Sequence, residues 1–391
     1  MDAVQLPTIE LHAHLNGSIS PATMRRLLEA KRGILPADEL ARIQHLVDDT
    51  KRDLQTCFDL FGCIYKLVDN LAALEMITRD VLHEFQADGI VYLELRSTPK
   101  AFADSTKQQY VETILRVMDA FQAEHTMWCR LIISIDRTKG SQEMTLHLAE
   151  LDTPDEAAVL LATNPDRIGH GTFLTYTRAD DGDGGDEDDR GEGNGCGDDA
   201  GRDCGDGDDN KQPVRGGVCM DNHRHVPIEV CLTSNIRCKT VDTAHNHHIS
   251  DIVRANQPFC ICTDDKGVFA TTVSREWDLA ISSGHLQQSD VTWLTTITTA
   301  YTFLPTAAEV ASGCTVAPPT KEADVATTAT MDTATVASTS GSASVHYRPR
   351  ETQEALLERM VAQIRAVVGT EAQCATPADL TAHHQHRHQH R

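Results

Sequence analysis

Short hydrophobic runs, rich in β-branched residues, recur along this chain and predict β-strands. Most are apolar at consecutive rather than alternate positions, which is typical of parallel strands buried on both faces. Polar residues stand at the end of each run. Seven strands are predicted, over Thr8–Leu15, Ile90–Arg96, Cys129–Asp136, Met144–Glu150, Arg167–Gly171, Val226–Leu232 and Phe259–Asp264.

Helical periodicity fills several segments between these strands. One helix is predicted to begin with Ser20 as N-cap and Pro21 in its first turn, and to stop at Gly33. Alternating strands and helices predict an α/β protein, and polar residues at every strand end favour a TIM-type (β/α)8 metal-dependent hydrolase barrel. A doubly wound open sheet is the alternative, but it would gather its ligand at one crevice. The other helices are predicted over Leu71–Asp88, Tyr110–His125, Trp277–Leu286 and Glu354–Val368.

Three segments of biased composition cannot contribute to a core. We expect them to be parts of a single barrel domain spanning 1–391: a disordered acidic Gly/Asp insertion at 178–215, a low-complexity Ala/Thr/Ser-rich loop or linker insertion at 306–345 and a disordered His-rich tail at 376–391. Between Asp180 and Asp209 the first holds fourteen acidic residues against two arginines. A calcium site there is disfavoured, because no EF-hand spacing can be aligned.

Bulk properties narrow the function class. A net charge of −23 argues against nucleic acid as a partner. No window is apolar enough to span a membrane, and no leader-like segment is recognisable, so we expect a cytoplasmic protein without a membrane partner. Separately, we expect the protein to be a monomer. The chain has no C-x-x-C pair, so a structural zinc knuckle is not expected. Four cysteines fall in apolar runs and are predicted to be buried thiols: Cys129, Cys231, Cys260 and Cys262.

The strand ends carry the candidate chemistry. His12 and His14 stand two positions apart, so in a strand both imidazoles point the same way. Alone, such spacing more often reflects structural histidines or chance than a metal site. The metal-site interpretation gains support from possible metal ligands and acid/base groups at other strand ends, namely His147, Glu150, His170, Asp264 and Asp265. Three imidazoles and a carboxylate suit Zn²⁺ with an open water position, which predicts metal-assisted hydrolysis.

These residues lie in motifs that resemble a known family. ELHAHLNGS, HLAE, DRIGHGT, CLTSN and CTDD are similar to motifs of the adenosine/AMP deaminase family. VYLELRSTP and ICTDDKGVFA resemble the adenosine deaminase-like subgroup that acts on N6-methyl-AMP. The resemblance covers 5–175 and 224–303, extends to the helix near Glu354–Val368, and implies that the single domain over 1–391 is a deaminase barrel. It implies a zinc-dependent aminohydrolase that converts N6-methyl-AMP to IMP and methylamine.

The resemblance also implies roles for individual residues. Glu150 matches the acid that protonates N1 of the purine, and His170 matches the residue that orients and helps deprotonate the zinc-bound water. Asp265 matches the residue that hydrogen-bonds N7. The ligands implied for one Zn²⁺ per chain are His12, His14, His147 and Asp264, of which Asp264 also belongs to the catalytic set with Glu150 and His170.

Further positions match substrate contacts, in addition to His14. Asn16 matches a residue near the sugar-phosphate side of the nucleotide, and Lys100 is a plausible phosphate partner on charge grounds. Tyr65 stands where the subgroup carries a histidine, which departs from the pattern. The strand-end loop positions that match nucleotide contacts are Thr98, Pro99, Lys100 and Asp136.

One departure concerns the barrel itself. Only seven residues, Arg137 to Glu143, separate two predicted parallel strands, whereas such a crossover takes about a dozen. The resemblance implies a further βα segment here, and we predict that it is missing after residue 136. Either a coding segment is absent, the interpretation we favour, or the chain is a degenerate relative. Two alternatives to the N6-methyl-AMP activity therefore stay open: an adenosine deaminase and a non-catalytic deaminase relative.

Overall fold

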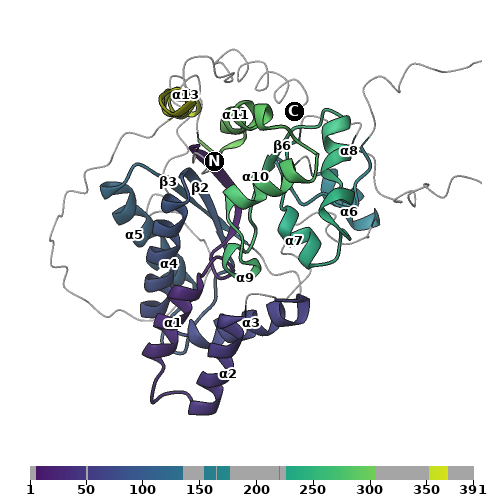
Figure 1. Ribbon diagram of the computed structural model, residues 1–391. Helices are drawn as coiled ribbons and strands as arrows, with labels where there is room; N and C mark the ends of the chain where they lie inside the picture. Colours follow the sequence, from purple (N-terminus) through teal and green to yellow (C-terminus); the bar gives the residue numbers. More distant parts are fainter. Residues whose placement is uncertain are drawn as a thin grey trace, which may run out of the picture.

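Parallel strands lie at the centre of the molecule (Figure 1), and the part of the chain that the structure describes contains six of them. The computed structural model describes residues 6–49, 52–134, 154–163, 165–176, 220, 226–304 and 352–368. One sheet has the order β1-β2-β3, with β1 at Thr8–His14, β2 at Ile90–Ser97 and β3 at Trp128–Ile133. A second has the order β4-β5-β6, with β4 at Ile168–Gly169, β5 at Ile228–Val230 and β6 at Phe259–Ile261.

The two sheets meet where β1 ends. Ala13 forms an isolated parallel bridge with Asp264, just beyond β6. The Asp264 amide donates to the carbonyl of His12 at 2.8 Å, and the His14 amide donates to the carbonyl of Asp264 at 3.0 Å. The strands therefore follow the order β3-β2-β1-β6-β5-β4. Within the described ranges no strand bridges β3 and β4. The predicted strand Met144–Glu150 and the short crossover before it lie outside those ranges, so the missing βα segment stays a prediction.

Helices cover the strands on their outer sides (Figure 1). α4 and α5 lie beside β2 and β3, while α6, α7 and α8 flank the second sheet. The helices are α1 (Pro21–Ala30), α2 (Ala37–Asp48), α3 (Leu54–Leu67), α4 (Leu71–Ala87), α5 (Lys107–Glu124), α6 (Pro154–Leu161), α7 (Leu232–Arg237), α8 (Ile249–Arg254), α9 (Lys266–Phe269), α10 (Val273–Ser282), α11 (Gln288–Ile297) and α13 (Gln353–Val368), with 3-10 turns η3 (Ala244–Asn246) and η4 (Thr298–Tyr301).

Side-chain caps decide several helix boundaries. Ser20 accepts from the Thr23 amide at the start of α1, as the sequence predicts. Thr106 and Gln109 form a capping box, so α5 begins three residues before the predicted Tyr110. The helix predicted over Trp277–Leu286 is wrong in position: α10 begins at Val273, because the Thr272 side chain accepts from the Arg275 amide.

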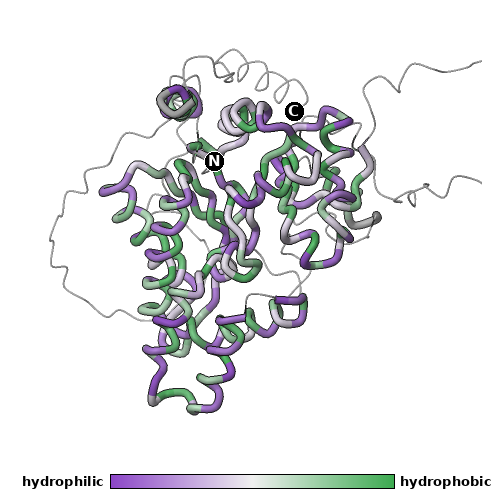
Figure 2. The backbone as a smooth tube through the Cα atoms, viewed as in Figure 1, coloured by the Kyte–Doolittle hydropathy of each residue, from purple (hydrophilic) through white to green (hydrophobic). Residues whose placement is uncertain are grey.

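Apolar and hydrophilic residues alternate along the helices (Figure 2), and the buried apolar residues of helices and strands form one core cluster. Every position of β2 is buried, as expected for a parallel strand covered on both sides. The four cysteines predicted to be buried thiols are buried and free. Among the described residues, no helix has the length and apolarity needed to cross a bilayer. The segments 178–215, 306–345 and 376–391 lie outside the described residues, so their predicted disorder is untested.

Candidate functional site

The first part of the site is the carboxyl end of β1. His12 and His14 lie there with ring centroids 5.3 Å apart, as their two-residue spacing predicts. The side chain of His12 is fully buried, whereas that of His14 is 26% exposed. Gly169 of β4 allows a close approach to His12, because a Cβ there would lie 2.8 Å from its Cε1 atom. His12 thus belongs to the interior of the barrel and His14 to its surface.

Asp264 brings a carboxylate to the same point. Its Oδ1 lies 3.5 Å from Nε2 of His12 and 3.3 Å from Nε2 of His14. The residue has a φ of 61°, a left-handed conformation that turns the chain sharply after β6. Burial alone would raise the pKa of Asp264, but the surrounding imidazoles hold that pKa well below its usual range; these are His12, His170 and His14.

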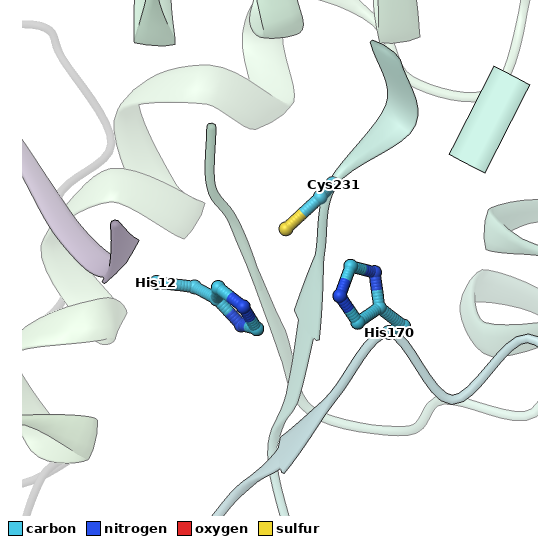
Figure 3. A group of neighbouring side chains, drawn as sticks. All are labelled: His12, His170 and Cys231. Atoms are coloured by element: carbon cyan, nitrogen blue, oxygen red, sulfur yellow. The ribbon is translucent and has the colours of Figure 1, made fainter. Parts of the chain in front are cut away.

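His170 and Cys231 form the other side of the site. Figure 3 shows their side chains and that of His12 pointing toward one another. His170 follows β4 with a φ of 61°, and its Nε2 lies 3.8 Å from Oδ2 of Asp264. Cys231 follows β5 directly. Burial, and next the charge of Asp264, raises the pKa of the Cys231 thiol well above its ordinary value.

Two overlapping sets of donors could hold a metal ion. In each set all ligand atoms lie within 4.8 Å of one another: His12 with His14 and Asp264, and His12 with His170 and Cys231. Both sets offer donor types that bind divalent cations, and the first combines two imidazoles with a carboxylate, a common donor combination for zinc. Nδ1 of His12 lies 2.8 Å from Oε2 of Glu229, and with the ring proton on that nitrogen His12 can offer the lone pair of Nε2 to a cation beside Asp264. A cation between these two acceptors would satisfy both.

Comparison with known proteins shows the family of this chain. The family model described as "Adenosine deaminase" matches residues 7–182 and 218–311. This chain belongs to the adenosine deaminase family. It is 32% identical to N6-methyl-AMP deaminase-L of Xenopus laevis over 351 residues, which cover 76% of this chain and 89% of that protein. It is also 32% identical to N6-methyl-AMP deaminase of Homo sapiens, over 73% of this chain and 86% of that one.

Solved structures of this family share the fold. The Arabidopsis N6-mAMP deaminase MAPDA aligns with a TM-score of 0.60 at 27% identity, covering 78% of this chain and 95% of that one. Arabidopsis ADAL in complex with IMP aligns with the same TM-score and identity, over 80% and 96%. Family and neighbours confirm the predicted metal-dependent TIM-barrel fold and the assignment to purine deaminases. The six described strands are therefore part of that barrel.

Two predicted substrate residues lie close to the adenosine deaminase-family site. Asn16 follows β1, and its side-chain oxygen is buried without a hydrogen bond to any described residue, which leaves it available to a ligand. Asp265 is adjacent to Asp264 and packs against Gly17, where a Cβ would lie only 1.6 Å from its Oδ1. The loop after β1 and the loop after β6 therefore pack closely against each other.

A second group of predicted substrate residues follows β2. Nζ of Lys100 donates to the carbonyl of Val68 at 3.0 Å and lies 5.0 Å from the ring centroid of Tyr65. Burial lowers the pKa of Lys100, and Tyr65 is 55% exposed. Thr98 is exposed, and Pro99 is half-buried. The structure thus brings Lys100 and Tyr65 together from β2 and α3, although these residues are far apart in sequence.

Three predicted residues lie outside the described ranges. They are Asp136, His147 and Glu150. The roles that the resemblance implies for them stay predictions.

A buried charge network beneath the site was not predicted. Glu229 of β5 accepts from Nδ1 of His12, from Arg96 of β2 and, at 2.7 Å, from Nε of Arg167. Arg167 also donates to Glu94 of β2. Burial opposes ionisation of Glu229, but Arg96 and Arg167 hold its pKa well below the ordinary value. The network fixes His12 and ties the two sheets together.

Glu10 belongs to the same interior layer. It accepts from the amide of His12 at 2.8 Å and from the hydroxyl of Thr263 at 2.7 Å, and burial raises its pKa to about 8. The sequence did carry a signal for these residues, because charged side chains inside apolar strand runs must be paired if the strands are buried. Glu10, Glu94 and Glu229 are each flanked by apolar residues.

Proposed function

We propose that this chain is a zinc-dependent aminohydrolase acting at C6 of a purine nucleotide, and that its substrate is N6-methyl-AMP. The observation that carries the proposal is the convergence of His12, His14, Asp264 and His170 within the family site. The names of the similar relatives support the choice of substrate. One Zn²⁺ per chain is part of the proposal.

The reaction consumes water and gives two products. The C6–N6 bond breaks, a C6–O bond forms, and the products are IMP and methylamine. Bound zinc lowers the pKa of water, which provides hydroxide near neutral pH. We assign Glu150 to protonation of N1, which makes C6 electrophilic, and Asp265 to a hydrogen bond with N7. His170 orients the attacking water.

Other side chains would hold the zinc ligands in place. His12, His14, His147 and Asp264 are the proposed ligands. Oγ of Ser234 donates to Oδ2 of Asp264 at 2.7 Å, which leaves Oδ1 facing the imidazoles. Glu229 fixes the ring of His12 through Nδ1. Both contacts restrict the ligands before any ion binds, as hydrogen-bonded partners of metal ligands generally do.

Selection for a nucleotide rests on the phosphate. We assign Asn16 to the sugar-phosphate side and Lys100 to the phosphate, with contacts from Tyr65, Thr98, Pro99 and Asp136. Adenosine lacks the phosphate, so removal of the Lys100 charge should discriminate between substrates. Lys100→Met should raise the KM for N6-methyl-AMP while leaving any adenosine turnover unchanged.

The deciding experiment is release of methylamine from N6-methyl-AMP by the purified full chain, with zinc content measured in parallel. Adenosine and AMP are the comparison substrates, and His14→Ala is the matched inactive variant. Turnover of N6-methyl-AMP that exceeds that of adenosine and depends on zinc supports the proposal. Preference for adenosine would favour the adenosine deaminase alternative. One equivalent of zinc without turnover of any substrate would favour a non-catalytic relative.

A further inference from the structure

A buried histidine outside the metal site has a defined protonation form. The amide of Ile249, an obligatory donor, donates to Nδ1 of His247 at 3.1 Å. Nδ1 therefore carries a lone pair, and the ring proton is on Nε2. That nitrogen lies 3.2 Å from Oδ1 of Asn235, and both side chains are fully buried. His247 thus donates to the side-chain amide of Asn235, and this bond requires the amide oxygen to face His247.

Thr240 fixes the same amide from the other end. Its hydroxyl donates to the backbone carbonyl of Asn235 at 3.1 Å. Having used its proton, the hydroxyl can only accept from the Asn235 side chain, 3.2 Å away, and this requires Nδ2 on that side. Two independent contacts therefore give the Asn235 amide one orientation, with its oxygen toward His247 and its nitrogen toward Thr240.

The nitrogen of this amide also faces His170. Nδ2 of Asn235 lies 3.4 Å from Nδ1 of His170 and 3.1 Å from the hydroxyl of Thr172. The two amide hydrogens are shared among three acceptors, so the bond to His170 is the longest. Because the amide nitrogen can only donate, a proton on Nδ1 of His170 would point at another donor. The geometry disfavours that form and places the His170 proton on Nε2, the nitrogen that faces Asp264.

We propose that Asn235, oriented by His247, is a positioning residue that holds His170 in the Nε2–H form and so presents a hydrogen-bond donor to the catalytic site. This rests on the role proposed above for His170. In this form His170 orients the attacking water by donating to its oxygen. The resemblance also implied that His170 helps deprotonate the water. The contact with Asn235 supports the orienting role and not the deprotonating role.

The test is ¹⁵N-histidine NMR of the full chain loaded with zinc and free of substrate. His170→Gln identifies the His170 resonances by their loss. The expected wild-type pattern is a protonated Nε2 and an unprotonated Nδ1. Asn235→Asp should move the proton to Nδ1, because a carboxylate can only accept, and Asn235→Leu should leave a mixture of both forms. Each substitution should lower kcat by about 10- to 100-fold with little change in KM.

A rescue variant separates orientation from packing. In His247→Gln the side-chain amide can donate to Asn235 in place of Nε2, so the wild-type pattern at His170 should persist, whereas His247→Leu should lose it. Thr240→Val removes the contact that fixes the nitrogen end of the same amide, so it should weaken the wild-type pattern as well.

A protonated Nδ1 in the wild type would overturn the proposal, and so would an unchanged pattern in Asn235→Leu. The wild-type spectrum decides even if a variant fails to fold. Because the spectrum needs no substrate, an enzyme without turnover but with the expected pattern would refute the proposed function and leave the orientation of His170 established.

Discussion

The two sheets supply the site in different ways. In the first sheet the strands are six to eight residues long, and the histidines of β1 are strand residues. In the second sheet the strands are only two or three residues long. There His170 directly follows β4, Asp264 lies in the turn that begins after β6, and both have positive φ angles. Regular strand geometry positions one half of the site, and strained turns position the other.

The difference has a physical consequence. Positive φ is costly for residues with a Cβ and persists where the surroundings enforce it. The Asp264 turn is held by backbone hydrogen bonds to β1, and the His170 turn by a bond from its amide to the carbonyl of Glu229 at 2.9 Å. The Asp264 turn of the second half therefore depends on β1 of the first half, so damage to β1 should also disturb the position of Asp264.

The largest expected effect is loss of the carboxylate ligand. Asp264→Ala removes the carboxylate ligand that the second half supplies, so it should abolish zinc binding. It should also lower kcat/KM by about a thousandfold or more, since metal chemistry supplies several kcal/mol of transition-state stabilisation. Zinc analysis and methylamine release measure it. The matched control is Asp251→Ala on α8, where Asp251 pairs with Arg254 at the surface. Retention of full zinc by the Asp264 variant would contradict the ligand assignment.

The next effect concerns the buried charges that join the halves. Arg167→Met leaves Glu94 and Glu229 without a shared cation and should lower the free energy of unfolding by about 3–5 kcal/mol. Urea denaturation measures this. Arg79→Met removes an exposed pair with Glu75 and should cost at most about 1 kcal/mol. Equal losses in the two variants would mean that the network does not tie the sheets together.

A smaller effect is expected where β4 packs on β1. A methyl group in Gly169→Ala would lie 2.8 Å from the His12 ring, so we expect an overpacking cost of about 1–3 kcal/mol and weaker zinc binding. Calorimetric titration with zinc and thermal unfolding measure both. Gly62→Ala on α3 is the control, because nothing lies within 4 Å of its added Cβ; it should be neutral or stabilising by up to about 1 kcal/mol. Unchanged zinc affinity in Gly169→Ala would mean that zinc binding by His12 does not depend on how β4 packs against β1.

The smallest effect lies outside both halves, on α2 and α3. Hydrogen bonds from Arg42 and Lys66 lower the pKa of Glu39 from 4.5 to about 2. A lowered pKa means that this stabilisation is fully present above pH 4.5 and is lost as pH falls toward 2. Glu39→Gln should therefore be slightly less stable than wild type at neutral pH, and the difference should vanish in acid. Urea midpoints along a pH series test this; a difference that grows as pH falls would contradict it.

The same contrast explains what the sequence could predict. The two-residue spacing of His12 and His14 requires only strand periodicity, so their convergence could be anticipated. His170 and Asp264 were predicted from their places at strand ends and their roles from motifs, but their positive φ angles have no periodic signature and were not predicted. The amide of Asn235 was not anticipated, since its partner His247 lies on a separate segment. The start of α10 was missed because the cap at Thr272 determines it rather than hydrophobic periodicity.

The most direct test of the account is a zinc-edge anomalous diffraction map of the full chain crystallised with zinc. We predict one peak per chain, bound by His12, His14, His147 and Asp264 at about 2.0–2.2 Å, with ligands from both halves of the barrel. A peak held by His12, His170 and Cys231 instead, or no peak in crystals of a protein that turns over N6-methyl-AMP, would contradict it.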